Sequence, residues 1–160
     1  MKLHVITTGG TIDKVYFDAT SEYEVGEPQV QEIFREANIR FAFTIESVLR
    51  KDSLELTAED RRLIRQRVEA SECERILLTH GTDTMVATAL ELRGIEGKTI
   101  VLTGSMQPAR FRSTDAVFNI GTAVGAVQVL PPGVYVVMNG RVFNPEEARK
   151  NRERNCFEEC

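Results

Sequence analysis

The sequence is poor in several features that mark particular classes of protein. It has no tryptophan and no apolar run near the roughly 18–20 residues that a membrane-spanning helix requires. It has no excess of basic residues either: 20 Lys and Arg face 24 Asp and Glu, and the net charge of −4 argues against nucleic-acid binding through phosphate neutralisation. The start of the chain lacks the basic and apolar regions of a secretory signal. We therefore expect a cytoplasmic protein without nucleic-acid or membrane partners.

Cysteine is also scarce, and the three present are an odd number, which is poor material for a disulfide framework. Cys156 and Cys160 could form half of a metal site if the tail were helical. The two histidines, His4 and His80, lie in or beside expected strands. We expect free thiols and no metal.

Along the chain, short apolar runs alternate with segments of helical periodicity, which is typical of an α/β domain. The runs are apolar throughout rather than on one side, as in parallel strands that helices cover on both faces. We predict one domain, residues 1–160, with a doubly wound, mainly parallel sheet. The expected strands are 3–6, 39–45, 76–79, 99–103 and 134–138, and the expected helices are 29–37, 57–70, 85–93, 113–127 and the first part of 145–160.

The polar stretch 13–27 is too long for a simple turn and contains Tyr16, Phe17 and Tyr23. A loop of this length in a compact domain is usually functional or mobile. Its aromatic side chains favour a flap over a pocket, with the alternative that they only anchor the loop.

Three of the expected strands end alike, with threonine, then glycine, then another hydroxyl: 7–11, 79–83 and 103–105. The carboxyl ends of parallel strands meet at one edge of a sheet, where ligands bind in α/β folds. Glycines there let backbone N–H groups approach a ligand closely. The hydroxyl of Thr11 beside such donors indicates a nucleophile next to an oxyanion site, with an ordinary strand-to-loop turn as the alternative.

Two of these loops resemble the signature loops of the bacterial-type L-asparaginase/glutaminase family. They are Thr8-Gly9-Gly10-Thr11-Ile12 and His80-Gly81-Thr82-Asp83-Thr84-Met85. The resemblance extends over nearly the whole chain, through Gly104-Ser105-Met106 with Pro108, Asp115 and Asn119, then Val136-Val137-Met138-Asn139 and a downstream lysine.

The resemblance implies the catalytic residues. Thr11 would be the nucleophile that attacks a side-chain amide, and Tyr23 would be the flap tyrosine that contacts it. Thr82, Asp83 and Lys150 would form the second polar triad. Alternatively, Lys150 is one more solvated residue in its basic run, and Tyr23 only anchors its loop.

The resemblance also implies the substrate contacts. Ser53 would hold the α-carboxylate and Asp83 the α-ammonium, and the backbone carbonyl of Ser105 would accept the amide NH₂. Gly10 and Gly81 belong to the loops whose backbone would line the amide, with the N–H of Thr82 as an oxyanion donor.

The sequence does not decide which group accepts the first proton, the one that Thr11 loses. Lys150 could act as a base only in its neutral form, which burial or a neighbouring cation would favour, whereas Asp83 favours the charged form. Water hydrolyses an acyl-enzyme, so we expect no cofactor. His80 is expected to be structural, and Asp13 and Asp52 are expected to border the site and shape it.

The chain also departs from the family pattern. Larger relatives have a C-terminal domain with a glutamate that orients the flap tyrosine, and we expect this chain to be a short one-domain form without it. Leu54 stands where relatives commonly have a polar residue. We expect a homo-oligomer, a dimer or tetramer, that covers the edge left by the second domain.

The resulting functional expectation is hydrolysis of L-asparagine to L-aspartate and ammonia. A glutaminase or another small-amide hydrolase is the alternative within the same chemistry, and a non-catalytic amino-acid-binding module is the alternative outside it. A nucleotide-binding domain is disfavoured, because neither GxxxxGK[ST] nor GxGxxG occurs and Asp83 would repel anions.

Overall fold

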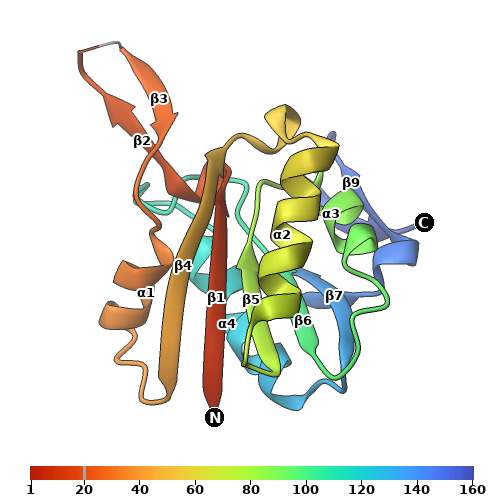
Figure 1. Cartoon of the computed structure of the whole chain (residues 1–160). Helices are drawn as coiled ribbons and strands as arrows, with labels where there is room; N and C mark the ends of the chain where they lie inside the picture. The colour runs from red at the N-terminus through yellow and green to blue at the C-terminus, as the bar shows by residue number, and fades with distance from the viewer. Residues whose placement is uncertain (20) are drawn as a thin grey trace.

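The computed structural model describes residues 1–19 and 21–160, and its centre is a six-stranded sheet (Figure 1). The strand order is β4-β1-β5-β6-β7-β8. The first five strands of this order run parallel, and only β8 is antiparallel, paired with β7. The bounds are β1 Lys2–Gly9, β4 Ala42–Lys51, β5 Arg75–Thr79, β6 Thr99–Thr103, β7 Gly133–Met138 and β8 Arg141–Phe143. The predicted α/β class is confirmed.

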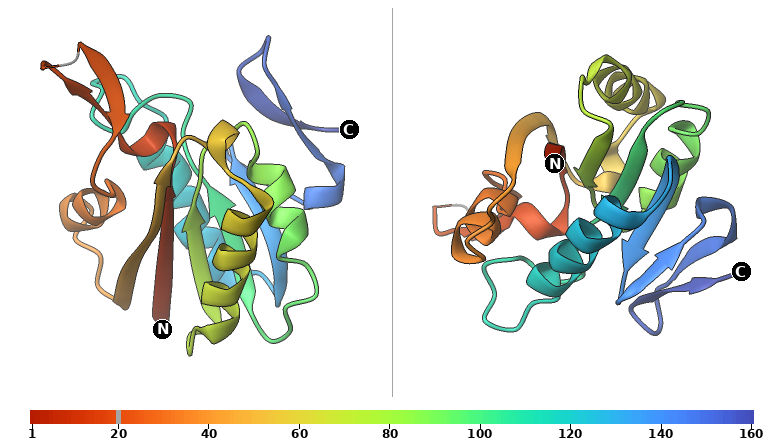
Figure 2. Two further views of the ribbon diagram at one scale, coloured as in Figure 1. Left: turned by 45° about the horizontal axis from the view of Figure 1, so that its top comes forward. Right: turned by 90° about the horizontal axis from the view of Figure 1, so that it is seen from below.

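Four helices cover the two faces of the sheet (Figure 2): α1 Val30–Glu36, α2 Ala58–Ala70, α3 Met85–Glu91 and α4 Ala116–Val129. Because side chains alternate along a strand, each central strand contributes to two cores. In β5, Ile76 and Leu78 pack with α2 and α3, whereas Leu77 packs with α1 and α4. The apolar runs of the sequence are therefore buried on both sides.

The start of α2 shows how local sequence fixes an element. The hydroxyl of Thr57 accepts the N–H of Asp60 at 3.1 Å, and the Asp60 carboxylate accepts the N–H of Thr57 at 2.9 Å. This reciprocal capping box satisfies two N–H groups that a helix start would otherwise leave without partners. The helix predicted over 57–70 is thus confirmed, with Thr57 as the residue that caps its start.

The sheet order places two glycine loops side by side. After β1 the chain forms β4 on one side of it, and then crosses to form β5 on the other side. The winding of the sheet therefore reverses between β1 and β5, and ligands bind at the carboxyl end of such a reversal in α/β folds. The three threonines of the repeated pattern are in register, because Thr7 pairs with Thr79 and Thr79 with Thr103. The loops that follow these threonines consequently begin at the same height along the carboxyl edge of the sheet.

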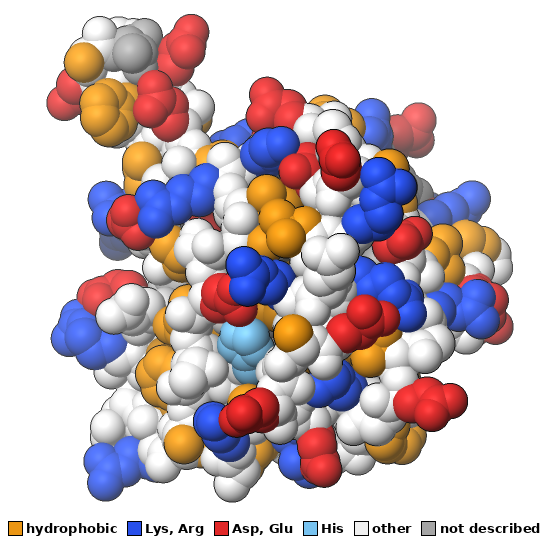
Figure 3. Space-filling view, viewed as in Figure 1, with side chains coloured by type: hydrophobic (Ala, Val, Ile, Leu, Met, Phe, Trp, Pro, Cys, Tyr) orange, Lys and Arg blue, Asp and Glu red, His pale blue; other side chains and the backbone are white. Residues whose placement is uncertain are grey.

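The prediction of a loop over 13–27 is wrong, because most of the segment forms an antiparallel hairpin of β2 Lys14–Phe17 and β3 Glu22–Val25. Its aromatic and β-branched residues favour strands, and the rings of the paired Tyr16 and Tyr23 meet edge-on with their centroids 5.5 Å apart. The hairpin projects from the body, and Figure 3 shows apolar and acidic side chains at its tip.

The helix expected in the first part of the tail is also wrong. Pro145–Glu147 form one 3-10 turn, and a second hairpin follows, with β9 Ala148–Asn151 and β10 Cys156–Glu159. Ala148 and Phe157 are buried against the face that α2 and α3 cover, which a solvated helix would leave exposed. Cys156 consequently lies in a strand, and the helical spacing considered for a metal half-site does not exist.

The edge strand β4 was predicted too early, at 39–45 instead of Ala42–Lys51. Its pairing with β1 continues from Ala42 to Lys51, so the partner strand decides where β4 ends. The short β8 was not predicted. Within residues 1–19 and 21–160, no helix has the length and apolar character to cross a membrane.

Candidate active site

The loops at the carboxyl edge of the sheet pack backbone against backbone. A Cβ on Gly10 would lie 2.5 Å from the Cα and N of Gly81, and a Cβ on Gly81 would lie 2.6 Å from the Cβ of Ser53. Gly10 also has a φ of 86°, a conformation that side chains disfavour. Glycine at both positions therefore brings the loops after β1, β4 and β5 into direct contact.

Hydrogen bonds fix these loops to one another. The Thr8 hydroxyl donates to the carbonyl of Thr79 at 2.9 Å, and the Thr84 hydroxyl donates to the carbonyl of Ser53 at 2.8 Å. The N–H of Gly10 donates to the carbonyl of Lys51 at 2.9 Å. The threonines and glycines of the motifs thus hold the loops at this edge of the sheet in fixed positions relative to one another.

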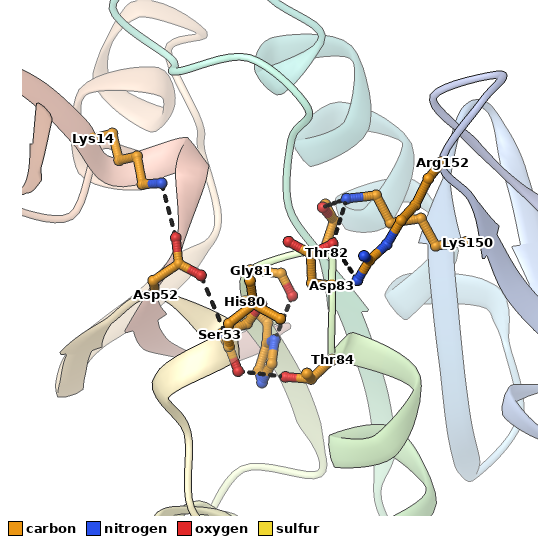
Figure 4. A network of polar contacts seen from close by, with 11 residues as sticks. Lys14, Asp52, Ser53, His80, Gly81, Thr82, Asp83, Thr84, Lys150 and Arg152 are labelled. Atoms are coloured by element: carbon orange, nitrogen blue, oxygen red, sulfur yellow. Dashed lines mark hydrogen bonds and ion pairs between the residues drawn. The ribbon is translucent and has the colours of Figure 1, made fainter.

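Thr82, Asp83 and Lys150 form one polar cluster (Figure 4). The Nζ of Lys150, on β9, donates to the Oγ1 of Thr82 at 2.8 Å and to the Oδ1 of Asp83 at 3.0 Å. Because Thr82 accepts from Lys150, its own O–H proton remains available for a ligand.

Thr11 and Tyr23 share a pocket on the other side of the edge. Thr11 lies in a 3-10 turn, Thr11–Asp13, directly after the Gly9–Gly10 corner. A pocket of about 340 Å³ is lined by Thr11, Lys14, Tyr23, Pro108 and Phe111. The Tyr23 ring lies edge-on to that of Phe111 at 5.8 Å, so the first hairpin is held over the pocket by an aromatic contact.

An ion pair ties this hairpin to the Ser53 loop. The Nζ of Lys14 donates to the Oδ2 of Asp52 at 2.8 Å, and Asp52 also accepts the N–H of Leu54 at 3.1 Å. Burial opposes ionisation of Asp52, but the bonds from Lys14 and Leu54 outweigh it and hold the pKa of Asp52 below its ordinary value. Asp52 therefore remains a carboxylate that shapes the border of the site.

Ser53 and Ser105 are both buried, each about 1% exposed. Among the described residues the Oγ of Ser53 has no hydrogen-bond partner, whereas the Oγ of Ser105 donates to the carbonyl of Gln107. An unpaired buried hydroxyl is unfavourable unless a ligand satisfies it. Ser53 is one of three described residues with such a hydroxyl, the others being Thr7 and Thr79, and its side chain lies against Gly81.

His80 supports the backbone of the second glycine loop. Its Nδ1 lies 2.7 Å from the carbonyl of Gly81 and its Nε2 lies 2.8 Å from the hydroxyl of Thr88. The carbonyl can only accept, which places the ring proton on Nδ1. Burial lowers the pKa of His80 to about 4, so the ring is neutral and holds Gly81 in place rather than transferring protons.

Asp13 closes the base of the first hairpin. Its Oδ1 accepts the N–H of Gln29 at 2.8 Å, and its carbonyl accepts the N–H of Gly26 at 2.8 Å. Burial raises the pKa of Asp13 to about 7, although the bond from Gln29 and the charge of Arg50 lower it. Asp13 lies two residues after Thr11 and joins the Thr11–Asp13 turn to Gln29 at the start of α1.

The loop after β6 is held from α4. Asp115 accepts the N–H groups of Met106 and Gln107 at 2.9–3.0 Å, and Asn119 donates to the carbonyl of Gly104 at 3.0 Å. This explains why Asp115 and Asn119 accompany the Gly104–Met106 motif. They orient the segment that carries Ser105.

The structure thus brings the predicted residues into two groups, Thr82–Asp83–Lys150 in direct contact and Thr11–Tyr23 around one pocket. Sequence reasoning missed Phe111 and Lys14, which line the pocket, and Arg152, whose guanidinium lies 3.3 Å from Asp83. No local pattern marks them, because each acts through a contact with a distant loop. Across 1–19 and 21–160, no group of three or more His, Cys, Asp or Glu is placed to hold a metal ion.

Fold and site together define a doubly wound α/β domain whose binding edge joins a threonine turn to a threonine–aspartate–lysine cluster. The asparaginase N-terminal family model matches residues 2–159, and the chain belongs to this family. The resemblance read from the loops is thereby confirmed.

Two curated relatives and one solved structure show how similar this chain is to known members of the family. A glutaminase-asparaginase of Pseudomonas aeruginosa is 33% identical over 132 residues, which cover 77% of this chain and 34% of the relative. An L-asparaginase of Thermococcus kodakarensis is 33% identical over 155 residues, covering 89% and 45%. The structure of the thermostable L-asparaginase from that organism superposes with a TM-score of 0.82 at 29% identity, covering 99% and 51%. The chain therefore spans about half or less of the proteins it matches.

Proposed function

We propose that this chain hydrolyses L-asparagine to L-aspartate and ammonia through an acyl-enzyme on Thr11. The observation that carries the proposal is the hydrogen-bonded cluster of Thr82, Asp83 and Lys150, whose loop packs through Gly81 against Gly10 at the start of the Thr11 turn. Membership of the asparaginase family supports an amino-acid amide as the substrate.

The substrate is placed by three groups in this proposal. The Ser53 hydroxyl, buried without a partner among the described residues, binds the α-carboxylate. Asp83 faces the α-ammonium, and the backbone carbonyl of Ser105 accepts the amide NH₂. Gly10 and Gly81, which have no side chains, allow the backbone to line the reacting amide.

The chemistry proceeds in two steps. The Oγ of Thr11 attacks the amide carbon and forms a C–O bond, and the N–H of Thr82 meets the negative charge that develops on the oxygen. The C–N bond then breaks as the proton that Thr11 has given up reaches the leaving nitrogen, and ammonia departs. Water cleaves the resulting ester, which releases L-aspartate and restores Thr11.

Lys150 and Tyr23 have distinct roles in these steps. Lys150 donates to Thr82, so it stabilises negative charge and supplies the proton route through the Thr82 hydroxyl to the leaving group. Tyr23 closes the pocket over Thr11 and excludes water during acylation.

Hydrolysis of L-glutamine is a second candidate, since the similar protein of Pseudomonas aeruginosa is a glutaminase-asparaginase. The two substrates differ by one methylene, which changes binding by only about 1–3 kcal/mol. The relative rates on the two amides therefore have to be measured.

Ammonia release from L-asparagine and L-glutamine tests the proposal, with Thr11→Val and Lys150→Met measured beside the unaltered protein. Release that depends on both residues supports it. L-Aspartate binding without release from either amide contradicts it and favours an amino-acid-binding module.

We also propose a homo-oligomer, because large apolar side chains such as Phe118 and Val129 are exposed. Light scattering tests this, and a fully active monomer contradicts it. The cytoplasmic location stays a prediction.

A further inference from the structure

The carboxylate of Asp83 is shared by two cations of the second hairpin. Its Oδ1 lies 3.0 Å from the Nζ of Lys150 and 3.3 Å from a guanidinium nitrogen of Arg152. Figure 4 shows both side chains reaching Asp83 from the same side. Lys150 is mostly buried, whereas the Arg152 side chain is 69% exposed and covers the cluster from outside.

This arrangement competes with the role that the proposed function gives to Asp83. A substrate α-ammonium would be a third cation at a carboxylate that already faces two, and like charges repel at such distances. The neighbouring carboxylate, Asp52, is paired with Lys14 at 2.8 Å and offers no free substitute. In the hairpin itself, Glu153 lies on the same turn as Arg152, and Glu158 is paired with Arg149.

We propose that Arg152 determines substrate choice at this site: it occupies the place of the α-ammonium on Asp83, so the site favours ω-amides of dicarboxylic acids that lack a free α-ammonium. The inference rests on the proposed amide hydrolysis and specifies its substrate class. A simple member of that class is succinamic acid, which is L-asparagine without the α-amino group. The carboxylate that the two share would still bind at Ser53.

Turnover gives the first test. The kcat/KM for succinamic acid and L-asparagine is measured for the unaltered chain, for Arg152→Gln and for Arg154→Gln. Arg154 is the matched control, because it lies on the same turn and its replacement removes the same charge without touching Asp83.

The unaltered chain should prefer succinamic acid by about two- to fivefold, the range that one exposed ion pair supplies. Arg152→Gln should remove this preference by lowering the KM for L-asparagine, and Arg154→Gln should retain it. A preference for L-asparagine in the unaltered chain, or a ratio unchanged by Arg152→Gln, overturns the proposal.

Binding of the reaction products gives a test that does not need turnover. Succinate and L-aspartate differ only by the α-ammonium, and calorimetric titration compares their affinities. Tighter binding of succinate that Arg152→Gln reverses supports the proposal, even if no amide releases ammonia and the hydrolytic function fails. Equal affinities, tighter binding of L-aspartate, or no binding of either product overturns it.

Discussion

The ammonium of Lys150 lies 2.8 Å from the hydroxyl of Thr82, although 68 residues separate them in the sequence. The second hairpin makes this contact, because it carries β9 back over the carboxyl edge of the sheet (Figure 2). The hairpin is anchored by Phe157, which is buried in the core. The polar cluster therefore depends on a packing contact at the end of the chain.

Replacing Lys150 by methionine should lower ammonia release by about 100-fold or more, because Thr82 loses the donor that orients its hydroxyl. Asp83 keeps Arg152 as a partner, so folding should be retained. Steady-state assays measure the effect. Arg149→Gln is the control, since its guanidinium pairs with Glu158 and not with the cluster. Equal losses in both variants would contradict the role of Lys150.

Replacing Thr11 by valine should reduce ammonia release at least about 10³-fold, because the side chain keeps its shape and loses the attacking oxygen. The affinity for L-aspartate should change little. The matched control is Thr44→Val at an exposed position of β4, far from the carboxyl edge. Activity in Thr11→Val close to that of Thr44→Val would assign the nucleophile elsewhere.

Replacing Gly10 by alanine should destabilise the fold by about 2–3 kcal/mol, from strain at a φ of 86° and overlap with the Gly81 backbone at 2.5 Å. Denaturant unfolding measures this. Gly125→Ala is the control: nothing lies within 4 Å of its added Cβ inside α4, and helix propensity predicts a gain of about 0.5–1 kcal/mol. Tolerance of both changes would show that the loops can move apart.

Replacing Phe111 by alanine should lower kcat/KM by about three- to tenfold, because Tyr23 loses its edge-on partner over the pocket. The comparison is Phe118→Ala, which removes an exposed ring on α4 outside this pocket. Kinetics with L-asparagine distinguish the two. If both variants keep full activity, Tyr23 is not held by Phe111.

Asp13 should make the protein less stable as the pH rises. Burial raises its folded pKa to about 7 from 3.8, so the folded state binds a proton that the unfolded state has released. Stability is therefore greatest below about pH 4 for this group and falls until about pH 7, by up to about 4 kcal/mol. His80 has the opposite effect. Its folded pKa is below 6.5, so the unfolded state binds a proton first and stability falls as the pH drops from about 6.5 to about 4.

The Asp13→Asn variant isolates the contribution of Asp13 because its amide oxygen can still accept the N–H of Gln29. It should match the unaltered protein near pH 4 and exceed it in stability by pH 8. Urea unfolding at several pH values measures the difference. A difference that does not change with pH would contradict a titrating Asp13.

The sequence was informative where structure is local. The apolar runs of β5 and β6 and the helix that starts at Thr57 depend on neighbouring residues, and all three were predicted. The glycine loops were found for the same reason, since a strand, two small residues and a hydroxyl lie within one short segment.

The two hairpins were not predicted, because contacts with residues outside each segment complete them. Residues 148–159 are highly charged, and only the burial of Ala148 and Phe157 against the sheet turns them into strands. The first hairpin likewise depends on the contact of Tyr23 with Phe111 and the closure at Asp13.

The sequence by itself determined that this is a doubly wound α/β domain with a threonine turn at its binding edge, because strand periodicity and glycine corners are short-range properties. Only the tertiary structure decided which charges meet there. The pairs Lys14–Asp52, Lys150–Asp83 and Arg152–Asp83 join residues far apart in the chain, and each exists because packing places its partners within a few ångströms.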